Sequence, residues 1–120
     1  MEYIEIIKKK NDFYNVYGDS IYIMNYLFKY KIIDNEKVGF PVSSLSKVVK
    51  TLDKYNINYK IDEYKIFKKF GSKNNYHNIL VKAIENKKLN DKVKLIEEKL
   101  LNASNDKIDK ILYFLENELI

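Results

Sequence analysis

The side chains that could do chemistry in this sequence are lysines, carboxylates, tyrosines and one histidine. There is no cysteine, which removes thiolate nucleophiles, disulfides and cysteine-bound zinc or iron. His77 is the single imidazole. Most general-base, nucleophile-activating and metal-binding arrangements rely on one or more imidazoles, and His77 alone, with no cysteine in the chain, cannot build them. His77 lies among asparagines where a helix is expected to start, and a solvated or capping role is its ordinary interpretation. The sequence therefore predicts no metal site and no cofactor.

Two other kinds of catalytic or nucleotide site are also unsupported. The 17 acidic residues could form a two-carboxylate site, but no pair lies in an apolar surrounding that would raise one pKa. The three glycines, Gly18, Gly39 and Gly71, are scattered, so neither a P-loop nor a dinucleotide-binding loop can be written. We therefore expect a protein that binds a macromolecule and is not an enzyme.

The positive charge of the chain is concentrated in its first part. Residues 1–75 hold 14 lysines against 9 acids, and residues 76–120 hold 8 lysines against 8 acids, which together give the net charge of +5. This favours an acidic partner such as nucleic acid for residues 1–75. All 22 basic residues are lysine, so any contact should be to phosphate and carry little sequence information. A bias toward lysine, asparagine, isoleucine and tyrosine is equally typical of an AT-rich genome.

Length and hydropathy set the expected organisation and location. The 120 residues fit one domain with at most an appendage. No stretch approaches 18 consecutive apolar residues, and the first residues lack a basic segment followed by an apolar one. We therefore expect neither a membrane span nor a signal peptide, and a cytoplasmic location.

The first part of the chain reads as a small α/β domain. Alternating residues predict strands over residues 3–10 and 13–17 with a bend at Asn11-Asp12, then a helix capped by Asp19 or Ser20 that ends near Tyr30. Residues 31–33 fit a short strand or a last helical turn. Gly39-Phe40-Pro41 is expected to stop whatever precedes it.

Helical and strand periods then follow one another. Ser43 or Ser44 is expected to cap a helix with apolar residues from Leu45 to Tyr55, and the runs 57–61 and 64–70 alternate as strands do. The expected fold class is α/β (α+β), a small mixed sheet of four or five strands flanked by helices. This domain should cover residues 1–72.

Residues 73–120 predict a C-terminal extension of three amphipathic helices. Their apolar positions fall in 76–84, 89–100 and 108–119, with breaks at Lys87-Lys88 with Asn90 and at 102–105. The extension is neutral in charge, which suggests packing on the α/β domain or on a second copy of the chain. A homodimer through these helices is therefore one expectation.

Two segments together resemble the N-terminal mismatch-recognition domain of the MutS family. Residues 12–20, Asp-Phe-Tyr-Asn-Val-Tyr-Gly-Asp-Ser, are similar to that domain's Asp-Phe-Tyr-Glu-Leu-Phe-x-Asp-Asp-Ala segment. Residues 38–41, Val-Gly-Phe-Pro, with the helix and the strand 56–61 that follow, are similar to its Gly-Val-Pro, helix and strand. The resemblance covers about residues 3–70 and implies a mixed sheet flanked by helices that binds DNA.

The resemblance also implies roles for particular residues. Phe13 falls where the family places the aromatic wedge that enters the base stack at a mismatch, and a phenyl face can stack on any base. The family's glutamate is replaced here by Asn15, which keeps hydrogen bonding but loses the charge. A chain of 120 residues has no room for the family's connector, lever, clamp and ATPase, so it could only be a stand-alone recognition module or a fold with another use.

The candidate nucleic-acid-binding residues are Lys8, Lys9, Lys10, Phe13 and Asn15, and each has a structural alternative. The three lysines could meet phosphates or simply guard an edge strand against aggregation. Of Phe13 and Tyr14, one should point into the core, and the sequence does not say which.

A second interpretation of the same fold is a protein-binding or inhibitor protein of phage or mobile-element origin. An inhibitor of a nucleic-acid-handling enzyme such as a CRISPR nuclease would belong to this class. Eleven tyrosines suit a protein interface as well as they suit stacking on bases.

Overall fold

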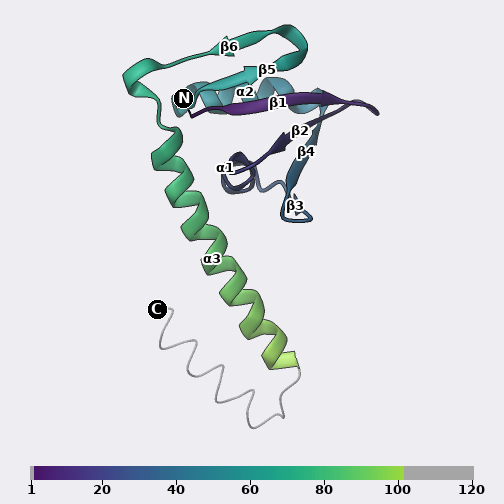
Figure 1. Cartoon of the computed structure of the whole chain (residues 1–120). Helices are drawn as coiled ribbons and strands as arrows, with labels where there is room; N and C mark the ends of the chain where they lie inside the picture. Colours follow the sequence, from purple (N-terminus) through teal and green to yellow (C-terminus); the bar gives the residue numbers. More distant parts are fainter. Residues whose placement is uncertain (1, 102–120) are drawn as a thin grey trace. The chain divides into compact units, whose positions relative to one another are not determined.

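The computed structural model describes residues 2–101 of the chain. The chain divides into two compact units, Met1–Lys87 and Lys88–Ile120. The first unit holds a mixed sheet, two short helices and the first part of a long helix (Figure 1). In the part of the chain that is described, no helix combines the length and the apolar character needed to cross a membrane.

The sheet has six strands in the order β3-β4-β2-β1-β5-β6. The strands are β1 (Ile4–Lys9), β2 (Phe13–Tyr17), β3 (Ile32–Ile33), β4 (Lys37–Pro41), β5 (Tyr59–Ile61) and β6 (Ile66–Lys68). β1 pairs with β5 in parallel and the other pairs are antiparallel, so the sheet is mixed. The expected α+β class is confirmed, but the sheet is larger than the expected four or five strands.

The strand that the sequence did not predict is β4. Gly39 and Pro41 are depleted in strands, which led to the expectation of a stop. Val38 and Phe40 nevertheless alternate with them and are fully buried, and each pairs with a buried residue of β2. Pro41 is the last residue of β4, where the loss of one N–H donor matters least.

The turn between β1 and β2 forms as expected at Asn11 and Asp12. Both residues have positive φ, 69° and 60°. Asparagine and aspartate tolerate this left-handed conformation better than other residues with a Cβ atom, because their side chains bond to the local backbone. The turn places Lys9 directly opposite Phe13.

Three α-helices accompany the sheet: α1 (Ser20–Phe28), α2 (Leu45–Lys54) and α3 (Tyr76–Leu101). Short 3₁₀ turns cover Val42–Ser44, Asp62–Tyr64 and Gly71–Lys73. α1 and α2 begin without a side-chain capping bond from Asp19 or Ser44, so the capping expected at those residues is wrong. The Ser20 hydroxyl is instead 2.8 Å from the Tyr76 hydroxyl, a buried hydrogen bond that joins α1 to α3.

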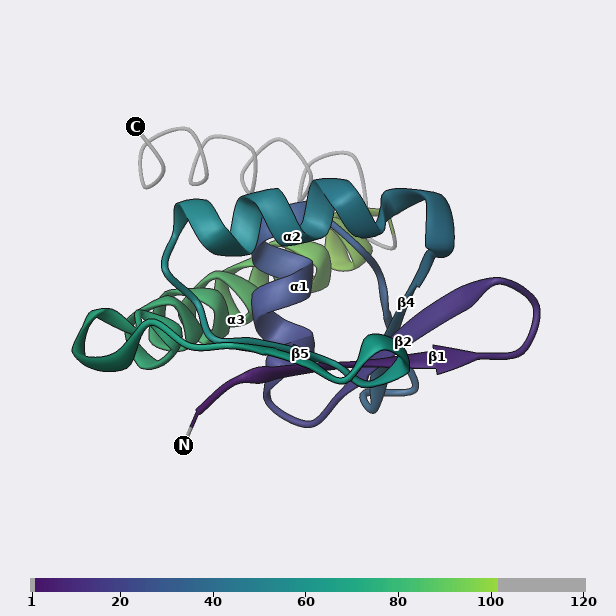
Figure 2. The same cartoon turned by 90° about the horizontal axis from the view of Figure 1, so that it is seen from above.

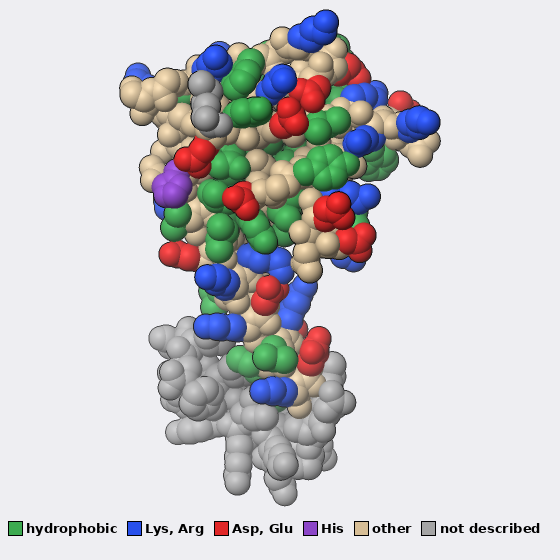
Figure 3. Space-filling view, viewed as in Figure 1, with side chains coloured by type: hydrophobic (Ala, Val, Ile, Leu, Met, Phe, Trp, Pro, Cys, Tyr) green, Lys and Arg blue, Asp and Glu red, His purple; other side chains and the backbone are tan. Residues whose placement is uncertain are grey.

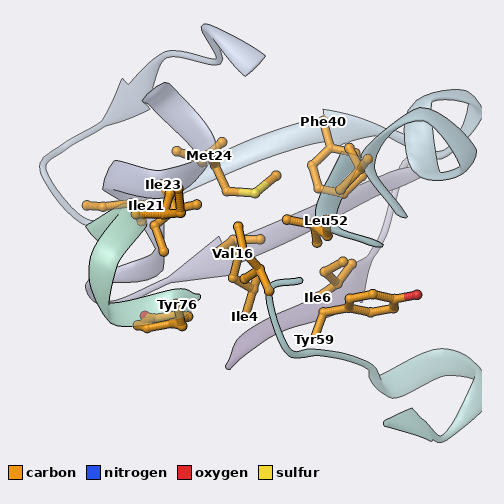
Figure 4. Packing of buried hydrophobic residues seen from close by; sticks show 14 of the residues in the cluster. Ile4, Ile6, Val16, Ile21, Ile23, Met24, Phe40, Leu52, Tyr59 and Tyr76 are labelled. Atoms are coloured by element: carbon orange, nitrogen blue, oxygen red, sulfur yellow. The ribbon is translucent and has the colours of Figure 1, made fainter. Parts of the chain in front are cut away.

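The helices α1, α2 and the first turns of α3 cover the same face of the sheet (Figure 2). Their apolar side chains meet those of the strands in one core, drawn in Figure 4. Its fully buried members from the strands and from the helices are Ile4, Ile6, Tyr14, Val16, Val38, Phe40, Ile23, Met24, Val48 and Leu52. From α3, Tyr76, Ile79, Leu80 and Ala83 belong to the same core.

The start of α3 is fixed by Asn74. Its side-chain oxygen accepts hydrogen bonds from the backbone N–H groups of Asn58 at 3.0 Å and Tyr76 at 3.2 Å, and its amide donates to the Glu2 carbonyl at 3.0 Å. One side chain therefore ties the helix start to the segment before β5 and to the N-terminal segment. His77 lies beside this start as expected, 72% exposed, with its Nδ1 3.8 Å from a Glu2 carboxylate oxygen.

The expected helix break near residue 88 is wrong, because α3 runs continuously to Leu101. No glycine or proline follows Gly71; lysine is a good helix former, and asparagine weakens a helix without ending it. The apolar positions of 76–84 and 89–100 differ in phase by roughly 140° at 3.6 residues per turn. In the sequence pattern, this change of the apolar helix face looks the same as a loop between two helices. The expected helix at 108–119 lies outside the described residues.

Candidate nucleic-acid interface

The face of the sheet opposite the helices is not covered by any helix in the described part of the first unit. Strand side chains alternate between the two faces, and the odd-numbered residues of β1, β2 and β4 point away from the core. None of these outward residues is buried, whereas their neighbours in the core are fully enclosed. We call this surface the open face. In Figure 3 it shows hydrophobic side chains exposed between lysines and carboxylates.

Three of the five predicted site residues lie together on the open face. Phe13 and Asn15 are two positions apart on β2, and Lys9 is the cross-strand partner of Phe13. The Phe13 side chain is 45% exposed, while Tyr14 beside it is fully buried. The alternative that the sequence left open is therefore decided: Tyr14 is the core residue and Phe13 is presented to solvent. Lys10 is exposed in the turn that follows Lys9.

Lys8 lies on the opposite face of the sheet. Its Nζ is 3.5 Å from a Glu63 carboxylate oxygen and 5.5 Å from the centre of the Tyr14 ring. The Tyr14 hydroxyl donates to the same carboxylate at 3.1 Å. Burial, followed by this hydrogen bond, raises the pKa of Tyr14, so its hydroxyl stays protonated and keeps donating. Lys8 is therefore held in a contact on the helix side, separate from Lys9 and Phe13.

Tyr17 and Lys37 also belong to the open face, although neither was predicted. Tyr17 continues the spacing of Phe13 and Asn15 along β2, and Lys37 is its partner on β4. The period of two could have identified Tyr17 from sequence alone. Lys37 could not be placed without knowing that residues 37–41 form a strand.

The Tyr17 hydroxyl is the centre of a small polar cluster. The Asn15 amide donates to it at 3.1 Å, and the Lys9 ammonium lies 5.5 Å from the Tyr17 ring centre. The Asn15 hydrogen bond is the main cause that lowers the pKa of Tyr17, and the charges of Lys9 and Lys37 act in the same direction. The Lys9 ammonium thus lies near the Tyr17 ring, and Lys37 is the cross-strand neighbour of Tyr17. Such a group favours an anion, because the phenol proton and the lysines can donate to it.

Gly39 allows the side chains of Phe13 and Asn15 to approach the β4 backbone closely. A Cβ atom at this position would lie 3.1 Å from the Asn15 side-chain oxygen and 3.8 Å from a Phe13 ring carbon. Glycine is thus favoured here by the closeness of the neighbouring side chains and not by its backbone angles, since its φ is not positive.

Within residues 2–101, no group of three histidine, cysteine or carboxylate side chains is arranged to hold a metal ion. Comparison with protein-family models, with curated proteins and with solved structures finds no match to this chain. The resemblance to the MutS mismatch-recognition domain therefore stays a prediction.

Proposed function

We propose that this chain is a non-enzymatic nucleic-acid-binding module that uses the open face of its sheet. Lysines contact phosphates there, and Phe13 stacks on a base. The observation that carries the proposal is that the Phe13 ring is presented to solvent on a sheet face that no described helix of the first unit covers. The same face carries Lys9, Asn15, Tyr17 and Lys37.

The chemistry of the open face suits a nucleic acid better than a small molecule. Stacking on an exposed ring does not depend on which base is present, and lysine attracts phosphate as a point charge. The cluster at Tyr17 offers an anion site on the same strand and the same face as the Phe13 ring. Asn15 adds an amide that can both donate to and accept from a base edge.

The test is a titration of the full chain with matched duplex, mismatched duplex and single-stranded oligonucleotides at two salt concentrations. Phe13→Ala should weaken binding by about 1–3 kcal/mol and leave the salt dependence unchanged. Replacing Lys9 and Lys37 together by alanine should flatten the slope of log affinity against log salt by about 0.7–0.9 for each phosphate that the lysines no longer neutralise.

Matched controls come from α2, on the other side of the sheet, and from Tyr55, the residue that directly follows it. Tyr55 is 37% exposed, so Tyr55→Ala removes an aromatic ring of similar exposure, and Lys47→Ala with Lys50→Ala removes the same charge as the open-face pair. If the α2 variants weaken binding as much as the open-face variants, the interface lies elsewhere. Absence of binding to all three oligonucleotides at low salt would favour the protein-partner interpretation.

A further inference from the structure

A second basic surface lies at the edge of the sheet, in the segment 64–75. It contains Lys65, Lys68, Lys69 and Lys73 and no acidic residue. Within the described residues, no carboxylate lies within ion-pair distance of any of these four lysines. β6, which belongs to this segment, is an edge strand paired with β5 alone. Four positive charges are thus concentrated in a few residues without internal compensation.

The same segment presents an aromatic ring on the open face. Phe67 is the partner of Lys60, which in turn pairs with the outward residue Glu5, so Phe67 points to the same side of the sheet as Phe13. Its ring packs against Tyr3, with 4.7 Å between ring centres, yet 38% of the residue is exposed. The Lys69 ammonium lies 4.8 Å from the Phe67 ring centre. A ring and a positive charge therefore occur together here, as they do at Phe13 and Lys9.

The two rings are far apart on the sheet. Three inter-strand steps separate β2 from β6, which is roughly 14 Å, and four residues along β1 separate the rows of Phe13 and Phe67, which adds roughly 13 Å along the strands. The combined span is about 20 Å. A stacked strand that rises about 3.4 Å per nucleotide would need about six nucleotides to reach from one ring to the other.

This arrangement, which rests on the proposed function, favours one form of nucleic acid. A duplex exposes a base face only where it is opened or kinked, so it could satisfy one ring but not two rings this far apart. An unpaired strand can turn a base toward each ring. Lys60, the cross-strand partner of Phe67, contacts Glu5 at 3.9 Å and Asp62 at 3.5 Å, so the charge of this lysine is already compensated.

We propose that the open face binds single-stranded nucleic acid that runs across the strands from Phe13 to Phe67, with Lys65, Lys69 and Lys73 holding the phosphates at the β6 end. Lys68 pairs with the buried Tyr59 and therefore points to the helix side of the sheet. Phosphate contacts are concentrated at the two ends of the path, and the middle is crossed with few. DNA and RNA share the required chemistry.

The experiment measures binding of the full chain to labelled oligo(dT) and oligo(U) of about three, six and twelve nucleotides, and to a hairpin duplex. Affinity should rise clearly from about three to about six nucleotides, where the strand reaches both rings. Phe67→Leu keeps apolar contact with Tyr3 and removes the ring, so the fold is preserved. This variant should bind the longer strands roughly 5- to 150-fold more weakly and lose the gain with length.

The contribution of charge is tested by replacing Lys65, Lys69 and Lys73 together by alanine. The slope of log affinity against log salt should flatten by up to about 2, at about 0.7 for each phosphate of a single strand. The matched control replaces Lys47, Lys50 and Lys54 of α2, which are also exposed and carry the same charge. It should leave the slope much closer to that of the unaltered chain.

The possible failures are distinguishable. If Phe13→Ala weakens binding while Phe67→Leu and the triple variant of Lys65, Lys69 and Lys73 do not, the β6 end is outside the footprint and this inference is wrong, although the proposed function stands. Tighter binding of the hairpin than of any single strand would overturn it in the same way. If no oligonucleotide binds, both proposals fail, and binding of poly-glutamate at the β6 edge would then indicate an acidic protein partner.

Discussion

The single residue with the sharpest consequence on the open face is Gly39. Because its φ is not positive, alanine can adopt its backbone conformation, and alanine in a strand is favoured over glycine by about 0.5–1 kcal/mol. The added Cβ would press on the Asn15 oxygen, which lies 3.1 Å away, and disturb the Asn15 to Tyr17 hydrogen bond. Gly39→Ala is therefore expected to keep or slightly raise the melting temperature while it weakens oligonucleotide binding.

This opposite effect on stability and binding separates a role in the site from a role in folding. Thermal melting and the titration must be made on the same preparation. A variant that binds as well as the unaltered chain would show that the close approach of Asn15 to Gly39 has no role in binding. A large loss of stability would show that the strand itself needs glycine.

The stability of the fold should depend on pH through Glu63. Hydrogen bonds from Tyr64 and Tyr14 and the charge of Lys8 hold the pKa of the Glu63 carboxyl below its usual 4.5. A carboxyl whose pKa is lowered by folding stabilises the fold fully above the unfolded pKa, and this contribution is lost as the pH falls through the folded pKa. The difference in melting temperature between the unaltered chain and Glu63→Gln should therefore shrink as the pH falls from about 6 to about 3. A difference that stays constant with pH would contradict the assignment.

At the scale of elements, the first part of α3 is part of the core and not an appendage. Ala83 is 1% exposed and lies among the core residues, whereas Val81, two positions earlier on the same helix, is 42% exposed. Ala83→Asp places a charge in this core, which costs several kcal/mol, comparable to the whole stability of a small domain. It should unfold the first unit.

Val81→Asp is the matched control, since it adds the same charge to the same helix at an exposed position. It should shift the melting temperature by only a few degrees, within the range of ordinary surface substitutions. Equal effects of the two substitutions, measured by circular dichroism at low protein concentration, would contradict the placement of α3 in the core.

The strength of the local signals determined which elements could be predicted from sequence. The α2 helix and the alternating strands β1, β2 and β5 carry a clear period, and the Asn11-Asp12 turn has residues that suit positive φ. The strand β4 was not predicted because Gly39 and Pro41 hide the alternation of Val38 and Phe40. The continuity of α3 was not predicted because the apolar face of the helix changes direction. A window of one or two turns cannot distinguish such a change from a loop.

Which residues lie on the open face depends both on alternation along each strand and on where the helices pack. The period of two already places Phe13 and Asn15 on one face, but which face is exposed depends on where the helices pack, and that is a tertiary property. Lys8, Lys9 and Lys10 look equivalent in sequence, yet alternation sends Lys8 to Glu63 and Lys9 to Phe13. Phe67 joins the open face only through the pairing of β5 with β6.

At the scale of the whole molecule, apolar side chains on α3 suggest self-association. Leu89 is 56% exposed, Leu95 52% and Val93 37%. Exposed apolar residues on one helix are a common basis for contact with a second copy. We expect the chain to form a dimer at tens of micromolar, and Leu89→Asp with Val93→Asp to shift it to monomer in sedimentation velocity. A strict monomer of the unaltered chain at this concentration would rule the dimer out.

The parallel pairing of β1 with β5 bears on how the chain is made. β1 is synthesised early, yet its neighbour on one side is complete only when the ribosome reaches Ile61, because Ile6 pairs with Ile61. Until then, a nascent chain can form the antiparallel β1-β2-β4 part while β1 keeps an unpaired edge beside unfinished core. Such an edge is a template for wrong pairing between chains. The stage before Ile61 leaves the ribosomal exit tunnel is therefore the one at which we expect this protein to need chaperones most, and ribosome-stalled chains in which Ile61 has or has not emerged should differ in protease resistance.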